Sequence, residues 1–417
     1  MREMKDSGIE WIGQIPKGWE LRRAKTLFTQ RNSKGNEIEV LLSPTQKYGV
    51  VPQSQLEGVV QVKEDTDLQM FKTVHKGDFV ISLRSFQGGF EYSLYEGVCS
   101  PAYQVFYPTS PICDTYYRYL FKSQSFISKM NNLTVGIREG KNIQYVDFAN
   151  SQIPVPPLAE QEHIAAFLDA ECAEIDAVLE KTRASIEEYK KLKQAVITQA
   201  VTKGIRGDRP MKDSGIEWIG DIPAEWSLVP FSKFARVSAN LVNPSDYQDY
   251  LQVSPENIEK DSGKLLPCKT VSEVGVESWN HFFHKGQILY SKIRPKLNKV
   301  CIAPFDGLCS ADMYPIDTDN ISKFVVYTIL SNDFNQQVAM ITENRVKMPK
   351  INQKELSKII VVLPADRMEQ QEIVDYLDGE CGKIDALIAK KQQYLTEIEN
   401  YKKSLIYEYV TGKKEVV

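Results

Sequence analysis

The sequence predicts an α+β chain in which two globular domains are joined by two long antiparallel helices, with a pseudo-twofold internal repeat. The first observation is a duplicated segment: Met4–Pro16 reads MKDSGIEWIGQIP and Met211–Pro223 reads MKDSGIEWIGDIP. The second is EHIAAFLDAECAEIDAVL from Glu162, which returns as QEIVDYLDGECGKIDALI from Gln371. The 417-residue chain is therefore two copies of a unit of about 209 residues, and two similar modules indicate a target with two similar halves.

The composition is that of an ordered globular protein, with 42% hydrophobic and 25% charged residues. No run of 18 apolar residues occurs and the N-terminus is polar, so we expect no membrane span, no signal peptide and a cytoplasmic location. Seven scattered cysteines without a CxxC pair indicate reduced thiols, and the four histidines predict no metal site. The net charge of −4 excludes a uniformly basic coat, so DNA contact would need local basic patches.

The first long helix is expected directly after a proline-rich stop, IPVPPL at Ile153–Leu158. Proline is excluded from a helix interior but is compatible with the start of a helix. From there to Lys203 no Pro or Gly occurs, and Gly204 supplies a C-terminal stop. Apolar or small residues recur mostly three, four or seven positions apart, as on one face of a long amphipathic helix: Ile164, Leu168, Cys172, Ile175, Leu179, Ile186, Tyr189, Val196 and Ala200.

The second long helix is expected to follow Leu363-Pro364, to run to about Val410 and to end at Gly412. Gly379 and Gly382 weaken the helix propensity of its first third. Its apolar face consists of Ile373, Leu377, Ile384, Ile388, Leu395, Ile398, Leu405 and Tyr409.

The two helices are expected to pack on each other. Antiparallel packing fits the connectivity, because a whole globular domain joins the end of the first helix to the start of the second. One domain would then sit at each end of the helix pair, as in a dumbbell. The alternative is that each helix covers its own domain. The predicted globular domains are residues 1–156 and 205–363, and the predicted helical segments are residues 157–204 and 364–417.

The two globular domains are related in sequence but have diverged in their loops. His75-Lys76-Gly77-Asp78 aligns with His284-Lys285-Gly286-Gln287, and each precedes an apolar run typical of a buried strand. GVCSPA from Gly97 aligns with GLCSAD from Gly307. Between these anchors the sequences disagree, which is expected of modules that bind different versions of one ligand class.

The basic residues gather in those variable stretches. Arginine and lysine suit phosphates and guanine edges, whereas asparagine and glutamine suit adenine edges. An ordinary solvated surface loop is the alternative, but basic residues recur at matching positions in both halves. The predicted DNA contacts are Arg84, Arg138, Lys141 and Gln144 in the first domain, and Lys292, Arg294, Lys296, Arg345, Lys347 and Lys350 in the second.

Two other repeated features are expected to be structural. Trp11, Trp19, Trp218 and Trp226 lie in the repeated W-I-G-x-I-P-x-x-W segment, where core packing is favoured over stacking on bases. Cys99 and Cys309 recur at matching positions without a nearby repeated histidine, so we expect buried side chains and no nucleophile. Signatures of nucleotide binding, hydrolysis and kinase chemistry are missing, as is the N/D-P-P-Y/F tetrapeptide of amino-methyltransferases. We therefore expect a non-catalytic chain.

The ordered set of motifs resembles the specificity (S) subunit of type I restriction-modification enzymes. The pieces that carry the resemblance are W-I-G-x-I-P-x-x-W in both copies, SKIRPKLNKV from Ser291, PPLAEQEHIAAFLD from Pro156, and the helix ends ITQAVTKG and IYEYVTGK. The resemblance covers essentially the whole chain. One departure is LPADRMEQQEI from Leu363, which has an insertion before Glu369-Gln370 in place of the usual double proline.

The resemblance implies that each globular part is a target-recognition domain that reads one half of a bipartite DNA site. The paired helices would fix the spacer and dock two modification subunits, which carry S-adenosylmethionine and methylate adenine N6. Restriction subunits with ATP and Mg would join them, and this chain would bind no cofactor itself. The main alternative is a coiled-coil adaptor for protein partners. A methyltransferase fused to its own recognition domain, and a half-functional relative that pairs with other S subunits, are further alternatives.

Overall fold

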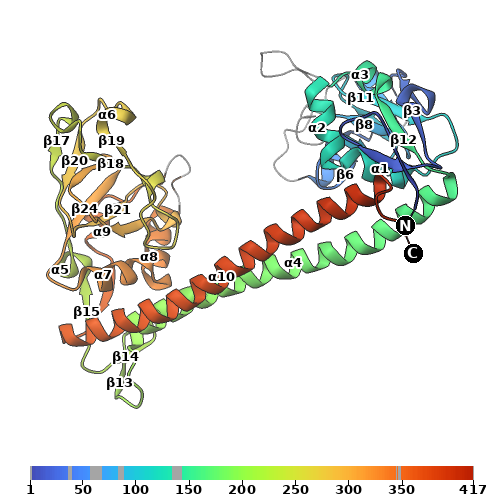
Figure 1. Ribbon diagram of the computed structural model, residues 1–417. Helices are drawn as coiled ribbons and strands as arrows, with labels where there is room; N and C mark the ends of the chain where they lie inside the picture. The colour runs from blue at the N-terminus through green and yellow to red at the C-terminus, as the bar shows by residue number, and fades with distance from the viewer. Residues whose placement is uncertain are drawn as a thin grey trace. The chain divides into compact units, whose positions relative to one another are not determined.

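Figure 1 shows the computed structural model, which describes residues 2–35, 40–56, 68–82, 89–133, 143–343, 345 and 349–416. The chain forms two compact units. Unit 1 comprises Met1–Thr182 with Gln393–Val417, and unit 2 comprises Arg183–Gln392. Each unit therefore contains one globular domain and a part of both long helices. None of the helices in the described ranges is long and apolar enough to cross a membrane.

The two long helices expected from the sequence are α4, Leu158–Lys203, and α10, Arg367–Val410. Each is followed by a glycine with positive φ, +74° at Gly204 and +70° at Gly412, a conformation that favours glycine at a helix end. Gly379 and Gly382 lie inside α10 without interrupting it. The insertion near Leu363 does not displace the helix start, because α4 begins two residues before Glu160 and α10 two residues before Glu369.

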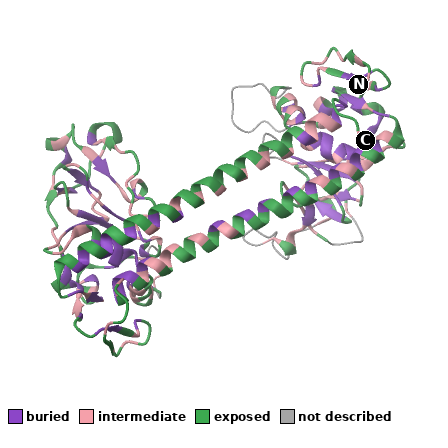
Figure 2. Cartoon of the chain, turned by 60° about the horizontal axis from the view of Figure 1, so that its bottom comes forward, coloured by how far each residue is buried: buried purple, intermediate pink, exposed green. Residues whose placement is uncertain are grey.

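The helices are antiparallel within each unit. In unit 1 the rings of Phe167 and Tyr409 lie 4.4 Å apart, and Asp176, further along α4, pairs with the earlier Lys402 of α10 at 2.6 Å. In unit 2 Lys193 pairs with Asp385 at 2.7 Å, and Arg206, further along α4, pairs with the earlier Glu372 at 2.7 Å. Figure 1 and Figure 2 show the two helices side by side.

Both predicted apolar faces are buried or half-buried along their whole length, while the other faces of the helices are exposed (Figure 2). Ile164 and Leu168 of α4 belong to the core of unit 1, whereas Ile197 and Val201 of the same helix belong to the core of unit 2. α10 likewise contributes Leu405 to unit 1 and Ile373 to unit 2. The alternative in which each helix covers only its own domain is therefore wrong.

The globular part of unit 1 is a set of small antiparallel sheets covered by short helices. Its largest sheet has the order β4-β11-β8-β9, with β4 Phe28–Arg31, β11 Gln104–Pro108, β8 Phe79–Ile81 and β9 Phe90–Tyr92. The two-stranded pairs are β1 Met4–Asp6 with β2 Gln14–Pro16, β3 Glu20–Arg23 with β12 Gln152–Val155, β5 Leu42–Thr45 with β6 Gly49–Pro52, and β7 Lys72–Val74 with β10 Gly97–Cys99. The helices are α1 Asp114–Lys122, α2 Gln124–Leu133 and α3 Tyr145–Asn150, with 3-10 turns at Ala24–Thr26, Gln53–Gln55 and Leu68–Met70.

The globular part of unit 2 has one sheet of four strands and one of five. One has the order β16-β24-β21-β22, with β16 Arg236–Val237, β24 Met313–Asp317, β21 Ile288–Ser291 and β22 Val300–Ile302. The other has the order β17-β20-β23-β18-β19, with β17 Leu241–Val242, β20 Asn280–Phe283, β23 Gly307–Cys309, β18 Leu251–Val253 and β19 Lys269–Thr270.

The remaining elements of unit 2 repeat the plan of unit 1. The paired strands are β13 Met211–Asp213 with β14 Asp221–Pro223, and β15 Ser227–Pro230 with β25 Ile360–Leu363. The helices are α5 Phe231–Phe234, α6 Val271–Val274, α7 Ser322–Leu330, α8 Asn332–Thr342 and α9 Gln353–Leu356, with 3-10 turns at Pro244–Tyr247, Pro255–Asn257 and Pro295–Leu297.

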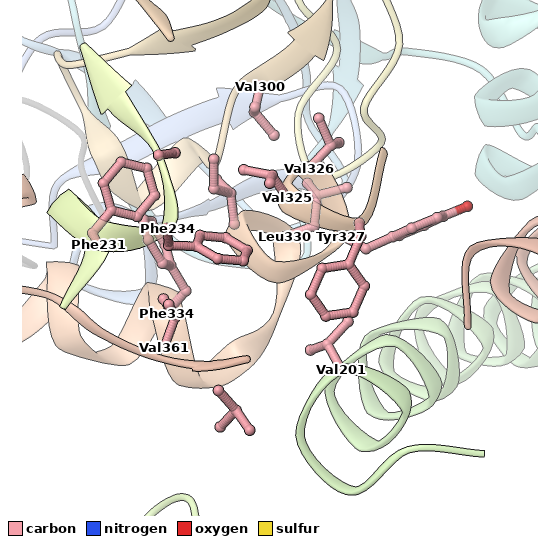
Figure 3. Packing of buried hydrophobic residues seen from close by; sticks show 14 of the residues in the cluster. Val201, Phe231, Phe234, Val300, Val325, Val326, Tyr327, Leu330, Phe334 and Val361 are labelled. Atoms are coloured by element: carbon pink, nitrogen blue, oxygen red, sulfur yellow. The ribbon is translucent and has the colours of Figure 1, made fainter. Parts of the chain in front are cut away.

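Aromatic and aliphatic side chains fill both cores. In unit 2 Phe231, Phe234 and Phe334 cluster beside α7, and Val201 from α4 joins the same cluster (Figure 3). Trp19 and Trp226 are no more than 1% exposed, which confirms that these two indoles are core residues. The prediction of core packing is wrong for Trp218, which is 39% exposed, whereas Trp11 is half-buried and packs against Phe126 at the edge of the core of unit 1. Cys99 and Cys309 are buried as expected, and burial raises the pKa of the Cys99 thiol to about 12.

The internal repeat extends to individual contacts between each domain and the start of a long helix. The Trp19 indole N–H donates to Glu160 at 2.8 Å, and the Trp226 indole N–H donates to Glu369 at 2.9 Å. The acceptor of each pair also forms an ion pair with an arginine that lies over the same indole, Arg2 in unit 1 and Arg209 in unit 2. Each half of the chain therefore holds its domain on a helix with the same carboxylate–indole–guanidinium group.

Candidate nucleic-acid interface

Six of the ten predicted DNA contacts lie in the described part of the chain. They are Gln144, Lys292, Arg294, Lys296, Arg345 and Lys350. The other four, Arg84, Arg138, Lys141 and Lys347, lie outside the described residues. The arrangement can therefore be built in detail only for the second domain.

The fold brings two basic segments of the second domain together. The first follows β21 directly and contains Lys292, Arg294 and Lys296. The second is near Lys350 and precedes α9. The backbone N–H of Arg294 donates to the carbonyl of Pro349 at 2.8 Å, and Ile351 donates to the carbonyl of Lys292 at 2.9 Å. Segments more than fifty residues apart thus form one surface, called here the basic cluster and consisting of Lys292, Arg294, Lys296 and Lys350.

A tight turn carries two members of the basic cluster. Arg294 and Asn298 flank the 3-10 turn Pro295–Leu297, and both adopt the left-handed conformation, with φ of 44° and 46°. That conformation is unusual for a side chain larger than glycine, and it is further disfavoured at Arg294 because a proline follows. Asn298 is 1% exposed, and its side-chain amide donates to the carbonyl of Leu330 at 3.3 Å. The surrounding fold therefore imposes the shape of the turn.

The four cations of the basic cluster differ in their partners. Lys292 lies over the ring of Tyr314, 5.2 Å from its centroid, and Lys350 pairs with Asp312 at 3.2 Å. Arg294 and Lys296 are exposed, and neither side chain has a hydrogen bond or ion pair with any described residue. Two cations are therefore held against the domain and two project into solvent.

Arg345 is occupied by a contact inside the domain. Its guanidinium forms an ion pair with both carboxylate oxygens of Glu355 and donates to the carbonyl of Lys350. Hydrogen bonding from Arg345 holds the pKa of the Glu355 carboxyl below its usual range. Glu355 also accepts from the backbone N–H of Asn352, the N-cap of α9. Arg345 thus fastens the segment that carries Lys350, and its assignment as a DNA contact stays a prediction.

Gln144 has a local structural role in the first domain. It is the N-cap of α3, in a capping box with Asp147, and its backbone N–H donates to Asp147 at 3.3 Å. Asn352 and Glu355 form the equivalent capping box at α9 in the second domain. The position is therefore a repeated helix cap, and a DNA contact by the exposed Gln144 also stays a prediction.

The sequence interpretation missed three residues that shape the basic cluster. Tyr314 and Asp312 hold Lys292 and Lys350, and Asp312 belongs to the anchor GLCSAD, whose repetition was the available signal. His281 on β20 is 5% exposed, and its Nδ1 is buried without a partner among the described residues. Burial first, and the charge of Lys292 second, lower the pKa of His281, so the ring is neutral beside the basic cluster at neutral pH. Among the described residues, no three His, Cys, Asp or Glu side chains gather as a metal site.

Comparisons with known proteins agree on one family. The family model described as the type I restriction modification DNA specificity domain matches residues 16–188 and 237–400, once in each half of the chain. The specificity subunit of the type I restriction enzyme EcoDI of Escherichia coli is 33% identical over 351 residues, which cover 78% of this chain and 76% of that protein. The MjaVIII specificity subunit of Methanocaldococcus jannaschii is 26% identical over 297 residues, 67% of this chain and 66% of that protein.

A solved structure on the complex assembly and conformational transition of the type I R-M system contains a chain of the same fold. The two superpose with a TM-score of 0.70 over 96% of this chain and 99% of that chain, at 14% sequence identity. None of these comparisons supports the adaptor alternative. With both halves matched by the family model and a relative at 33% identity, the chain belongs to the DNA specificity subunits of type I restriction-modification enzymes.

Proposed function

We propose that each globular domain of this specificity subunit reads one half of a bipartite, asymmetric DNA site. The observation that carries the proposal is that the family model matches both halves, while the loops between the repeated anchors differ. Equal scaffolds support two equivalent docking geometries on duplex DNA, and different loops support two different half-sites. In this proposal residues 1–156 and 205–363 are the recognition domains, and residues 157–204 and 364–417 are the helical spacer.

The proposed DNA surface of the second domain is the basic cluster. Its cations are near one another because of backbone pairing between two loops, and Arg294 and Lys296 have no described acidic partner. Lysine and arginine on exposed loops are suited to phosphates and base edges. The full proposed set also includes Arg84, Arg138, Lys141 and Gln144 in the first domain, and Arg345 and Lys347 in the second.

The long helices are proposed to fix the spacer between the half-sites and to dock two modification subunits, each of which methylates adenine N6. Support comes from the repeated carboxylate–indole–guanidinium group, since equal halves offer equal surfaces to two equal partners. Restriction subunits are proposed to join this assembly. S-adenosylmethionine, ATP and Mg would be bound by those partners. The specificity chain itself is proposed to be non-catalytic and cytoplasmic, on the grounds that its sequence lacks catalytic signatures and that its target is DNA.

The test is a genome-wide map of N6-methyladenine in cells with and without this gene. The expected result is the loss of one bipartite, asymmetric motif with a fixed spacer. A second strain, in which residues 205–363 are replaced by those of another specificity subunit, should keep one half-site and exchange the other. Methylation that is unchanged by deletion of the gene would contradict the proposal. A domain exchange that altered both half-sites would contradict the assignment of one half-site to each domain.

A further inference from the structure

The members of the basic cluster are not equivalent, and Arg294 differs from the rest in its backbone. It is the cation at which the chain enters the left-handed conformation, with φ of 44° and ψ of 53° directly before Pro295. Such backbone outliers persist only where the surrounding structure enforces them, and they are concentrated at functional sites. In a solvated loop without a functional role, a residue before proline would be expected to adopt the extended conformation that such residues prefer.

The enforcing contacts surround Arg294 on both sides. Its N–H donates to the carbonyl of Pro349 at 2.8 Å, and its carbonyl accepts from Leu297 at 2.8 Å. Pro295 and Asn298 are buried, and the preceding Lys292 is tied by its N–H to the carbonyl of Asp312 at 3.0 Å. The backbone of Arg294 is thus fixed by the neighbouring loop and turn, while its side chain is exposed. Recognition of a nucleic-acid base needs a polar side chain on a fixed backbone, because its hydrogen-bond donors must be held at a defined position.

The chemistry of the side chain adds a second argument. A guanidinium presents a planar pair of donors that matches the O6 and N7 acceptors of guanine in the major groove, whereas an ammonium acts as a point charge suited to phosphate. Lys296, which is two residues away and is also exposed, carries such an ammonium. Lys292 and Lys350 are held by Tyr314 and Asp312, so their charges act close to the domain surface.

We infer that Arg294 reads a guanine in the half-site of the second domain, and that Lys296 contacts the neighbouring phosphate backbone. The inference rests on the proposed function and deepens it, because it separates the residue that determines sequence choice from the residues that contribute charge. The half-site of the second domain must then contain a G·C pair.

The experiment uses the full-length chain assembled with its modification subunits. Three variants are compared with the wild type: Arg294→Lys, which keeps the charge and removes the fork, Arg294→Ala, and the matched control Lys296→Ala. Binding is measured by titration against the cognate duplex and against duplexes in which each base pair of the half-site is changed in turn, over a series of salt concentrations. Stoichiometry and melting temperature of each complex are measured in parallel, so that a folding defect is recognised.

For Arg294→Lys we expect discrimination at one G·C position to fall by about 10-fold or more, with the salt dependence of binding unchanged. For Lys296→Ala we expect a uniform loss of affinity on all duplexes, and a salt slope smaller by about one. If Arg294→Ala fails to assemble, the Arg294→Lys variant still decides the question.

Two outcomes would overturn the inference. Arg294→Lys could retain full discrimination at every position, which would make Arg294 a phosphate contact, or the second half-site could contain no G·C pair. Failure of the proposed function is a different result, since the wild-type complex would then show no preference for any bipartite duplex.

Discussion

The two globular domains agree where they meet the long helices and differ in the stretches that carry the predicted DNA contacts. Trp19 with Glu160 and Trp226 with Glu369 make the same hydrogen bond in both halves. The loops that carry predicted DNA contacts have different sequences, LRSFQGGFEYS in the first half and SKIRPKLNK in the second. The duplication is thus kept where each domain meets its helix, and sequence change is concentrated in the stretches that carry the predicted DNA contacts.

The turns His75–Asp78 and His284–Gln287 also share a geometry while they differ in sequence. The backbone N–H of His75 donates to the Asp78 carboxylate at 2.9 Å, and that of His284 donates to the Gln287 side chain at 2.7 Å. The carboxylate then pairs with Arg31 at 2.7 Å, whereas the amide donates to Asp317 at 2.7 Å. One turn geometry is therefore maintained by two side chains of different charge, because only the position of an acceptor oxygen is required.

The strongest test of the shared scaffold is removal of an indole. Trp226→Ala leaves a large cavity and removes a donor from buried Glu369, so we expect it to destabilise unit 2 by about 3–5 kcal/mol. Trp19→Ala is expected to act equally on unit 1. Denaturant unfolding of the full chain measures both, and a loss below about 1 kcal/mol in one variant would show that the two groups are not equivalent.

The second largest effect is expected at the apolar faces along which α4 and α10 pack on each other. Ile384 is 5% exposed, so Ile384→Glu buries a charge without a partner and should cost about 3 kcal/mol or more. Leu387, on the same helix, is 41% exposed, which makes Leu387→Glu a matched control with little expected effect. Thermal unfolding and the yield of complex with modification subunits are the measurements. Equal losses of stability and of complex yield in the two variants would show that the apolar face of α10 does not hold the helices together.

A carboxyl present in only one domain should make their pH responses differ. Burial raises the pKa of Asp333 from its ordinary value of 3.8 to about 6, and Ser125 occupies the equivalent position in unit 1. The folded state then binds more protons than the unfolded state between these values, so unit 2 gains stability as pH falls through about 6 towards 4. Asp333→Asn should flatten this dependence, as followed by melting temperature against pH, while the exposed control Asp249→Asn should not.

The smallest expected effect is at Arg345. Because its guanidinium already pairs with Glu355, Arg345→Ala should change DNA affinity by no more than about fivefold, and less than Lys296→Ala does. A DNA titration with the assembled complex provides the comparison. A larger loss at Arg345 than at Lys296 would show that the paired guanidinium contributes more to DNA binding than the unpaired ammonium does.

The sequence predicted the elements whose cause is local. The long helices follow from apolar spacing between prolines and glycines, and the core position of Trp19 and Trp226 follows from the repeated segment around them. The capping box at α9 could also have been predicted, because Asn352 followed three residues later by Glu355 is a recognised pattern, whereas Gln144 followed by Asp147 departs from it.

The candidate site was less predictable, because its properties depend on contacts between distant segments. Nothing local to Arg345 indicates that Glu355 neutralises it, and nothing local to Arg294 indicates a left-handed backbone held by Pro349. Basic composition selected the loops as candidates, but the choice between a paired cation and an unpaired one is made by tertiary structure. The same limit applies to His281, whose burial follows from strand pairing.

The discontinuity of unit 1 has a consequence for biosynthesis. Its core includes Leu405 and Val410, the Tyr116 hydroxyl donates to the carbonyl of Val410 at 2.8 Å, and Lys413 donates to the carbonyl of Ile12 at 2.5 Å. Unit 2, by contrast, is one continuous stretch, Arg183–Gln392. During translation the second domain can complete its core before Leu405 and Val410 emerge from the ribosome, whereas the first domain, although synthesised earlier, must wait for these residues.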